Sequence, residues 1–359
     1  MRVLVTDHGS GALPEGCTPR AEITVRGRTL RFGALERPDT AFRPGADYNR
    51  SYALIRVLAF SLTQGDREAL ESNPPSSAGR GEFGTDFVGE VVAAGSEVPL
   101  SPGDHVLPVP CWPPQRPDTV SDLGLPTGAS SQLRRLHHRH LLRVPPDLGI
   151  AVAAALPTAA ISAYAMVHRA ALRPGDNVLI MAAATPFGRL AVQAATKLGA
   201  VVHALVEDST ETRPPAGLGV QEAFSLTEPA KLSHYARTIR GFDAVLAPSL
   251  SCDLEAAVRL CGFGARCVVG TTPSHSGGPA LPSLSSAALE SLVTKNVTLL
   301  GRKLGEKTDL AAAIADVQQG TLTPVIEQSF MGDDEIASFI HRTFDPERAD
   351  GVTYMFEKG

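Results

Sequence analysis

After Pro145, short apolar runs alternate with helical segments, and this alternation restricts the fold more than any other feature of the sequence. The runs that we predict as strands are DNVLIMA (176–182), AVVHALVE (200–207), FDAVLAP (242–248), ARCVVG (265–270) and KNVTLLG (295–301). A helix is predicted between the first two, over FGRLAVQAATKLG (187–199). Strands that alternate with helices indicate a doubly wound parallel sheet of the α/β class.

The first helix of this alternation carries an apolar stripe. Leu190, Ala194 and Leu198 are spaced four residues apart, so we expect them to face the sheet. Gly199 is predicted to end the helix as its C-terminal cap. Before the alternation, an alanine-rich segment (150–171) is helical in character, and Pro157 predicts a break within it.

A different pattern precedes Pro145. The segments YALIRVLAF (52–60), DFVGEVVAAG (86–95) and HVLPVP (105–110) are short, rich in β-formers and separated by glycine and proline, which is typical of a small β-barrel domain. We predict loops over 33–50, with a lid as one interpretation, and over 110–131. The chain ends with two helical segments and a last strand, GVTYMFE (351–357).

Composition excludes several classes of function. A net charge of −5 offers no basic surface for nucleic acid. No apolar run reaches the roughly 20 residues of a membrane span, and the N-terminus has no signal-peptide pattern, so we expect a cytoplasmic protein that does not bind membranes. The cysteines are odd in number and never spaced as CxxC, which argues against a disulfide framework or a cysteine-built zinc site.

The turn before the first helix resembles a dinucleotide-binding turn that has lost most of its glycines. In a GxGxxG motif the glycines allow a tight turn, close approach of the pyrophosphate, and close packing of helix on strand. Here these positions hold Ala183, Thr185 and Gly188, and Pro186 removes a backbone N–H. The Thr185 hydroxyl can replace a lost donor. Two interpretations stay open: a working cofactor site and a vestigial one.

The end of the second strand gives conflicting indications about the cofactor. Glu207 falls where an acidic residue binds the ribose 2′-OH of NADH. Arg213 lies six residues further on, within reach of the 2′-phosphate of NADPH. A glutamate in such a loop is also often just a solvated charge.

Five segments in this order resemble the medium-chain dehydrogenase/reductase superfamily over nearly the whole chain. They are GTDFVGEVVAAGSEVPLSPGDHV (84–106), LPTAAISAYAMV (156–167), ALRPGDNVLI (171–180), FGRLAVQAATKLGA (187–200) and NVTLLGRKLGEKTDLAAAIADVQQGTLTPVI (296–326). The resemblance implies a GroES-like β-barrel domain (1–150 and 301–359) and a Rossmann domain (151–300), with a nicotinamide bound in the cleft between them.

The resemblance also implies that no metal is bound. The positions of the zinc ligands in the zinc alcohol dehydrogenases of this superfamily fall on Thr63, the Thr85–Asp86 pair and Thr158. Three threonines cannot supply the nitrogen, sulfur or carboxylate ligands that a catalytic zinc needs, and Asp86 alone is not a site. The sequence is instead similar to the metal-free branch of quinone oxidoreductases and enoyl reductases, which mostly use NADPH.

By this resemblance, candidate catalytic residues are Thr63 and Gln64, as substrate or carboxamide contacts, and Tyr48, as a donor to an enolate. Asp66 is expected to fix the local loop. The residues implied for the cofactor are Thr158, Ala184, Thr185, Pro186, Phe187, Gly188, Glu207, Arg213 and Gly270. The cluster His137, His138 and His140 is interpreted as surface histidines. Segments 33–50, 110–131 and 271–294 are expected to set the substrate.

We therefore expect an NADPH-dependent reductase, with NADH as the alternative cofactor, that adds hydride to a carbonyl-conjugated C=C bond in bacterial natural-product biosynthesis. A narrower resemblance is to reductive cyclases of polycyclic tetramate macrolactam pathways, in which ring closure follows hydride addition. The partner is a small molecule, and a homodimer is the assembly to consider. A cofactor-free cyclase or binding protein on the same scaffold is the main alternative, and a zinc alcohol dehydrogenase is a third.

Overall fold

The computed structural model describes residues 1–7, 12–72, 81–110, 127–207, 218–248, 253–270, 284–345 and 351–357. The chain divides into two units, each described here by itself. Unit 1 comprises Met1–Thr158 with Val325–Gly359, and unit 2 comprises Ala159–Ser274 with Pro279–Pro324. The boundaries expected at 150 and 301 are therefore corrected to about 158 and 325. The reason is that β14 (Thr298–Arg302) pairs with the sheet of unit 2, and α8 (Lys307–Gln318) packs there too.

Unit 2 is built on a parallel sheet in the order β11-β10-β9-β12-β13-β14. Its other strands are β9 (Asn177–Ile180), β10 (Val201–Val206), β11 (Val220–Ser225), β12 (Phe242–Ala247) and β13 (Cys261–Gly270). This order, with the first strand central and a reversal between β9 and β12, is the one that binds dinucleotides at the carboxyl ends of its strands. The doubly wound α/β fold predicted from the alternation is confirmed.

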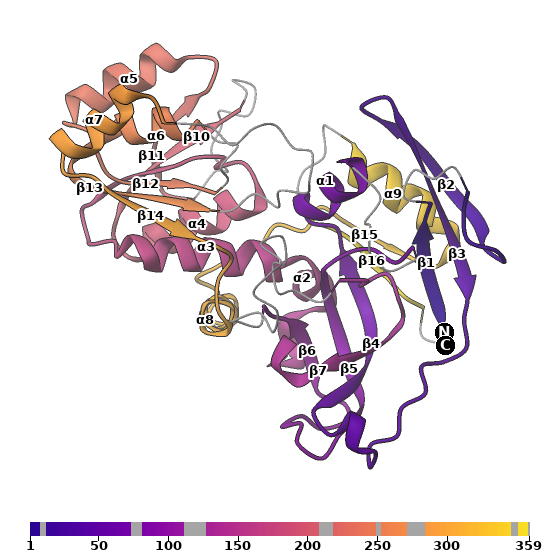
Figure 1. Cartoon of the computed structure of the whole chain (residues 1–359). Helices are drawn as coiled ribbons and strands as arrows, with labels where there is room; N and C mark the ends of the chain where they lie inside the picture. The colour runs from indigo at the N-terminus through magenta and orange to yellow at the C-terminus, as the bar shows by residue number, and fades with distance from the viewer. Residues whose placement is uncertain are drawn as a thin grey trace. The chain divides into compact units, whose positions relative to one another are not determined.

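Helices cover both faces of this sheet (Figure 1). They are α3 (Pro157–Ala170), α4 (Pro186–Lys197), α5 (Pro229–Thr238), α6 (Leu254–Leu260) and α7 (Ser286–Thr294). Apolar side chains of α5, α6 and α7 share one buried cluster with the strands, and α4 contacts β9 and β10. Pro157 does mark a break, because α2 (Ile150–Ala155) ends before it and Pro157 opens α3, where no helical N–H is lost.

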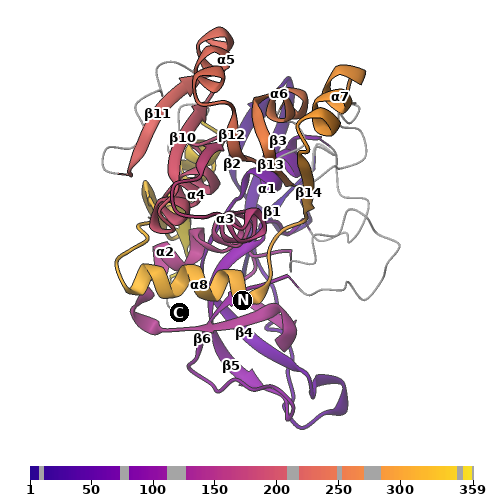
Figure 2. The same ribbon diagram turned by 90° about the vertical axis from the view of Figure 1, so that its left-hand side faces the viewer.

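The predicted stripe of the first helix is correct for Leu190 and Ala194, which are buried, but wrong for Leu198, which is 41% exposed. Leu198 is the C-terminal cap of α4 and lines a pocket formed by α3, α4 and α8. Figure 2 shows these three helices near one another. Gly199 follows with a φ of +80°, as expected of a residue that ends a helix in the left-handed region.

The described residues of unit 1 form two sheets. A three-stranded antiparallel sheet has the order β1-β3-β2, and a larger one has the order β15-β16-β4-β5-β6-β8, with β7 also paired to β4. The strands are β1 (Arg2–Thr6), β2 (Thr18–Val25), β3 (Arg28–Glu36), β4 (Tyr52–Ser61), β5 (Asp86–Ala94), β6 (His105–Pro108), β7 (Leu133–His137), β8 (Leu141–Val144), β15 (Gln328–Met331) and β16 (Val352–Met355). The helices are α1 (Gln64–Ser72), α2 and α9 (Ile336–Phe344).

Two of the predicted loops are partly regular structure. Residues 33–36 belong to β3, so the segment interpreted as a lid begins only after Glu36. Residues 286–294 of the third expected loop form α7, whereas 271–283 and 111–126 lie outside the described residues. The strands β1, β2 and β3 were not predicted from the sequence. None of the helices in the described parts of the chain has the length and apolar character needed to cross a membrane.

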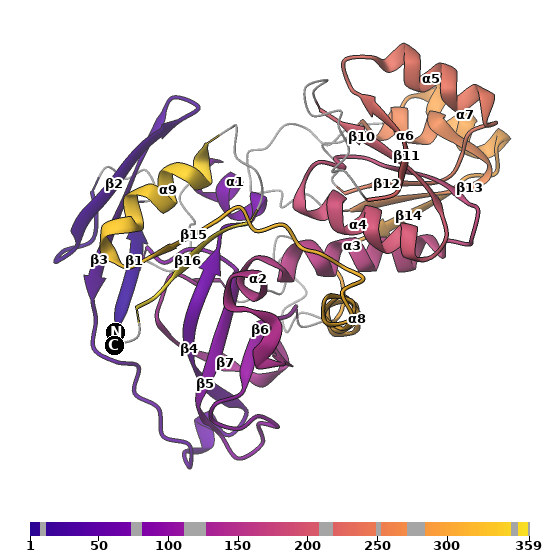
Figure 3. The same cartoon turned by 180° about the vertical axis from the view of Figure 1, so that it is seen from behind.

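A cluster of aromatic rings forms the core of unit 1. Phe60, at the end of β4, is fully buried, and its ring centroid lies 5.5 Å from that of Phe339 and 5.6 Å from that of Tyr354. Phe339 belongs to α9, which lies between β2 and β15 (Figure 3). The C-terminal segment thus completes a core to which the strands from β1 onward contribute.

A buried histidine in unit 2 makes stability depend on pH. His203 on β10 is fully buried, its Nε2 lies 3.2 Å from Asn177 Oδ1, and no partner among the described residues reaches its Nδ1. Burial lowers the pKa of His203, while Glu222 opposes the shift. The unfolded chain then binds a proton that the folded chain does not, so the free energy of unfolding falls as the pH drops below about 6.5.

We expect the variant His203→Gln, which cannot titrate, to lose less stability than the wild type between about pH 8 and about pH 5.5. The urea midpoint followed by circular dichroism measures this difference. Equal losses in both proteins would show that His203 does not contribute to the acid sensitivity.

Candidate functional site

The end of β4 and the start of β5 carry a cluster of polar side chains. Antiparallel pairing of Ser61 with Asp86 places Thr63 and Thr85 side by side, just beyond the paired residues. The chain then turns into α1, whose first turn carries Asp66. The Ser61 hydroxyl donates to the carbonyl of Ala154, which ties α2 to the same strand end. We call Thr63, Asp66, Thr85, Asp86 and Thr158 the polar cluster.

Asp66 organises the first half of the polar cluster. Its Oδ2 accepts hydrogen bonds from the Thr63 backbone N–H (2.9 Å) and hydroxyl (2.8 Å). The same oxygen accepts from the Thr85 backbone N–H (3.3 Å) and hydroxyl (3.0 Å). Thr63 Oγ1 in turn accepts from the backbone N–H of Asp66 (3.0 Å). The expectation that Asp66 fixes the local loop is confirmed.

Asp86 organises the second half. It is 1% exposed and accepts from the Thr158 hydroxyl through Oδ1 (2.5 Å) and from the Thr158 backbone N–H through Oδ1 (3.2 Å) and Oδ2 (3.0 Å). Thr158 lies in the first turn of α3 and is half-buried. A buried carboxylate therefore meets the hydroxyl of a half-buried threonine.

Both carboxyl groups favour the neutral form more than an exposed aspartate does. Burial raises the pKa of Asp66, against the hydrogen bonds from Thr63 and Thr85. Burial raises the pKa of Asp86 to about 7, and the charge of Asp66 adds to this rise, whereas the bonds from Thr158 oppose it. A carboxyl group with a pKa close to neutrality can act as an acid at neutral pH.

The hydrogen-bond directions define what the polar cluster can bind. Each threonine hydroxyl has one proton, and Thr63, Thr85 and Thr158 each donate it to a carboxylate. Among the described residues, no group of three or more His, Cys, Asp and Glu side chains is arranged to hold a metal ion. The chemistry of the cluster is that of hydrogen bonds and proton transfer.

The other candidate catalytic residues are placed differently. Gln64 is exposed at the start of α1, where its Nε2 donates to Glu68 (2.9 Å). Tyr48 is 65% exposed and precedes β4, whereas Thr63 follows it. A strand of this length separates them by about 30 Å at about 3.3 Å per residue. The strand β4 therefore holds Tyr48 apart from Thr63 and Gln64.

The turn between β9 and α4 occupies residues 181–185 of unit 2. Thr185 is the N-cap of α4: its hydroxyl donates to the carbonyl of Ala182 (2.7 Å) and accepts from the backbone N–H of Gly188 (3.2 Å). The hydroxyl proton is thus used within the turn. Ala182 has a φ of +53°, a left-handed conformation that usually requires glycine and that is strained in alanine.

Gly188 is the fingerprint glycine that the turn has kept, and the structure shows why. A Cβ at this position would lie 2.2 Å from the carbonyl oxygen of Ala182 and 2.4 Å from the Cα of Ala183. The helix can approach the strand end only because position 188 has no side chain. Gly270, at the end of β13, is also closely packed: a Cβ there would lie 2.2 Å from the carbonyl oxygen of Pro248.

These features fit a dinucleotide. The turn lies at the carboxyl end of the first strand, next to the reversal of strand order, and the N-terminus of α4 begins there. Pro186 is the first residue of the helix, where its missing N–H breaks no helical bond, and Phe187 is buried. The sequence analysis overlooked Arg189, whose Nε donates to the carbonyl of Ala184 (2.9 Å). The sequence feature that could have indicated Arg189 is its position directly after Gly188, at the start of the helix.

Comparisons with known proteins agree with this fold. The family described as Alcohol dehydrogenase GroES-like domain matches residues 49–146. Quinone oxidoreductase-like protein 2 of Bos taurus is 26% identical over 275 residues, which are 72% of this chain and 72% of that protein. Highly reducing polyketide synthase otaA of Aspergillus carbonarius is 32% identical over 187 residues, which are 51% of this chain and only 7% of the synthase.

Two solved structures cover nearly the whole chain. Alcohol dehydrogenase TADH from Thermus sp. ATN1 has a TM-score of 0.75 and 20% identity, covering 95% of this chain and 100% of that one. CurK enoyl reductase has a TM-score of 0.70 and 20% identity, covering 95% and 99%.

In sequence and fold this chain is similar to proteins of the medium-chain dehydrogenase/reductase superfamily. Both domain types expected from the sequence, a GroES-like domain and a Rossmann domain, are confirmed. The fold does not distinguish an alcohol dehydrogenase from an enoyl reductase, because structures of both kinds match it over the same share of the chain.

Cofactor preference in this superfamily depends on the residues after β10. Glu207 directly follows that strand and is exposed, at the position that we predicted. Arg213 lies outside the described residues.

The histidine cluster lies at the end of β7 and in the short helical turn after it. It consists of His137, His138 and His140, and the ring centroids of His137 and His138 are 4.8 Å apart in a stacked arrangement. They are half-buried and share no residue with the polar cluster or the turn.

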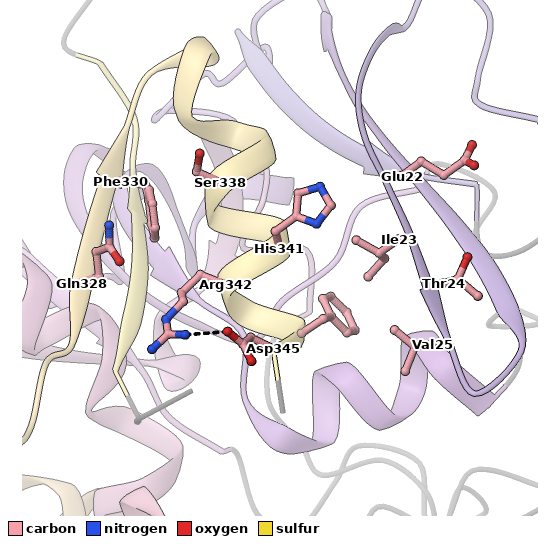
Figure 4. A pocket seen from close by; sticks show the side chains of 11 residues that line it. Glu22, Ile23, Thr24, Val25, Gln328, Phe330, Ser338, His341, Arg342 and Asp345 are labelled. Carbon is pink, nitrogen blue, oxygen red and sulfur yellow. Dashed lines mark hydrogen bonds and ion pairs between the residues drawn. The ribbon is translucent and has the colours of Figure 1, made fainter. Parts of the chain in front are cut away.

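Unit 1 also contains a groove of 630 Å³ between β2 and α9 (Figure 4). Ile23 and Val25 line one side and His341 the other, while Arg342 turns toward Asp345, to which it donates at 2.6 Å. The groove shares no residue with the polar cluster, so it has no part in the site described above.

Proposed function

We propose that this protein is a zinc-independent reductase that adds hydride from a nicotinamide cofactor to a carbonyl-conjugated C=C bond of a biosynthetic intermediate. The observation that carries the proposal is the polar cluster. Where a zinc alcohol dehydrogenase needs metal ligands, Thr63, Thr85 and Thr158 donate their hydroxyl protons to two aspartates. Such a site has no metal to polarise an alcohol, but it can supply a proton.

The setting that we propose is natural-product biosynthesis. The similarity to a highly reducing polyketide synthase supports it, and the fold shared with CurK enoyl reductase agrees with reduction of a C=C bond. The chain spans a small part of the synthase, so the substrate carrier and the substrate itself are not transferred from it. Reductive ring closure, in which the carbanion left by hydride addition attacks a second acceptor, is the narrower form of this proposal.

The residues of the turn support cofactor binding by this chain. Gly188 gives the close packing that a dinucleotide turn needs, and the dipole of α4 favours a pyrophosphate at its N-terminus. Arg189 brings a positive charge to the turn through its bond to Ala184, and this charge offsets the N–H that Pro186 lacks. When bound, the cofactor supplies a hydride.

NADPH is the cofactor that we propose, with NADH as the alternative. The metal-free branch that the sequence resembles mostly uses NADPH. Glu207 favours NADH instead, because an exposed carboxylate at the end of β10 repels a 2′-phosphate. Titration of the purified protein with each cofactor by fluorescence distinguishes them.

The competing function is a cofactor-free cyclase or binding protein. Its support is the low glycine content of the turn, the strained Ala182 and the use of the Thr185 proton inside the turn. Each of these is expected of a site that no longer binds pyrophosphate, so the two functions need a direct test.

The test follows the hydride. With NADPH deuterated on the transferring face and a trans-2-enoyl thioester, we expect one deuterium at the β-carbon of the product and one cofactor oxidised per product. Chelators should not change the rate, because no metal takes part. Mass spectrometry of the product and absorbance of the cofactor measure these quantities. Product formed at full rate without any nicotinamide would establish the cofactor-free cyclase instead.

A further inference from the structure

Reduction of a conjugated C=C bond needs a proton as well as a hydride, and the polar cluster contains a buried acid that contacts the hydroxyl of a half-buried threonine. Asp86 is 1% exposed, and its Oδ1 lies 2.5 Å from Thr158 Oγ1. Ser61 lies opposite it on β4, and Asp66 on α1 is the charged group among the described residues that acts on it. A substrate cannot touch Asp86 itself, so a proton from Asp86 must pass through Thr158.

We propose that Asp86 and Thr158 form a proton relay that delivers the proton to the carbanion left by hydride addition, an inference that rests on the proposed function. With Asp86 ionised, the Thr158 hydroxyl donates to Oδ1 and has no proton to give outward. With Asp86 protonated, the bond reverses: the carboxyl donates to Thr158 Oγ1, and the hydroxyl proton of Thr158 is free to point outward.

The transfer balances in atoms and charge. Hydride addition forms a C–H bond at the β-carbon and leaves an electron pair shared by the α-carbon and the carbonyl oxygen. The Thr158 O–H bond breaks as its proton moves to the α-carbon, and the Asp86 proton moves to Thr158 Oγ1. Asp86 is left as a carboxylate and takes a new proton from water through Thr158 after the product leaves.

The raised pKa of Asp86 agrees with this geometry. Burial raises it to about 7, and the charge of Asp66 adds to the effect. The protonated form of Asp86 is thus accessible near neutral pH. Because the relay works only from the protonated form, the rate is expected to fall as the pH rises above about 7.

Four variants test the relay. Asp86→Asn keeps an acceptor for the Thr158 N–H and hydroxyl but has no acidic proton, so it separates proton delivery from capping of α3. Thr158→Val removes the hydroxyl, and Thr158→Ser retains it. Ser162→Ala removes another half-buried hydroxyl from α3 and serves as the control.

We expect Asp86→Asn and Thr158→Val each to lower kcat by about a hundredfold with a trans-2-enoyl thioester and NADPH, and to lose the decrease above pH 7. Thr158→Ser and Ser162→Ala should stay within about threefold of the wild type. KM should change little, because neither group holds the substrate in its ground state. Wild-type rates and an unchanged pH profile in Asp86→Asn and Thr158→Val would overturn the relay and leave the reductase intact.

A readout without substrate completes the test. Difference infrared spectroscopy of the wild type should show a carboxylic-acid C=O band that titrates near pH 7, is absent in Asp86→Asn and shifts in Thr158→Val but not in Thr158→Ser. No titrating band would overturn the acid assigned to Asp86. If the band is present but the wild type oxidises neither NADPH nor NADH, the proposed function fails, and with it the use of the proton.

Discussion

Gly188→Ala is expected to destabilise unit 2 by about 3–5 kcal/mol, above the usual cost of about 1–3 kcal/mol for overpacking. The added Cβ would lie 2.2 Å from the Ala182 carbonyl oxygen and 2.4 Å from the Ala183 Cα. Both are backbone atoms, so no rotamer change relieves the contact, and Ala182 is already strained at a φ of +53°. Urea unfolding followed by circular dichroism measures the loss, and hydrogen exchange should place it in β9 and α4.

Gly301→Ala is the matched control. It adds the same methyl group to a glycine of the same unit, but nothing lies within 4 Å of its Cβ position and its φ is not in the left-handed region. We expect a change of no more than about 0.5 kcal/mol. Nicotinamide binding should be lost in Gly188→Ala and kept in Gly301→Ala. Equal stability of the two variants would show that helix α4 has room to move away from the strand end.

Phe60→Ala is expected to destabilise unit 1 by about 3–5 kcal/mol, the usual cost of removing a buried phenylalanine. The ring is fully buried and contacts the rings of Phe83, Phe339, Tyr354 and Phe356. The last three belong to the C-terminal segment, so the cavity would weaken its attachment to β4. Hydrogen exchange should show lost protection in α9 and β16 before the rest of the unit.

An exposed phenylalanine gives the control for this prediction. Phe263 on β13 is 80% exposed, and Phe263→Ala removes the same atoms from a site that buries little surface. The free energy of unfolding of this variant should match that of the wild type within about 0.5 kcal/mol. A loss in Phe60→Ala as small as this would mean that the aromatic cluster repacks around the missing ring.

The local sequence predicted those strands and helices whose hydrophobic pattern can be recognised within the segment itself. The strands β4, β5, β9 and β10 and the helix α4 lie where their patterns placed them, because alternation and helical spacing follow from the geometry of each segment alone. The same reasoning failed for Leu198, since the helix ends there and the residue is 41% exposed. The sequence could not show where the chain returns to unit 1, because that depends on β14 pairing with β13.

For the candidate site, too, some features could be predicted from the sequence and others only from the tertiary structure. The family resemblance placed threonines at the positions of zinc ligands, which argued against a zinc site, and the fingerprint register placed Gly188 at its third glycine. Only the tertiary structure joined Asp86 to Thr158, which are 72 residues apart, and Thr85 to Asp66, which are 19 apart. It also separated Tyr48 from Thr63 by the length of β4. Hydrogen bonds and burial between distant segments leave no periodic trace in a sequence, so acid strength and proton path were decided by the fold.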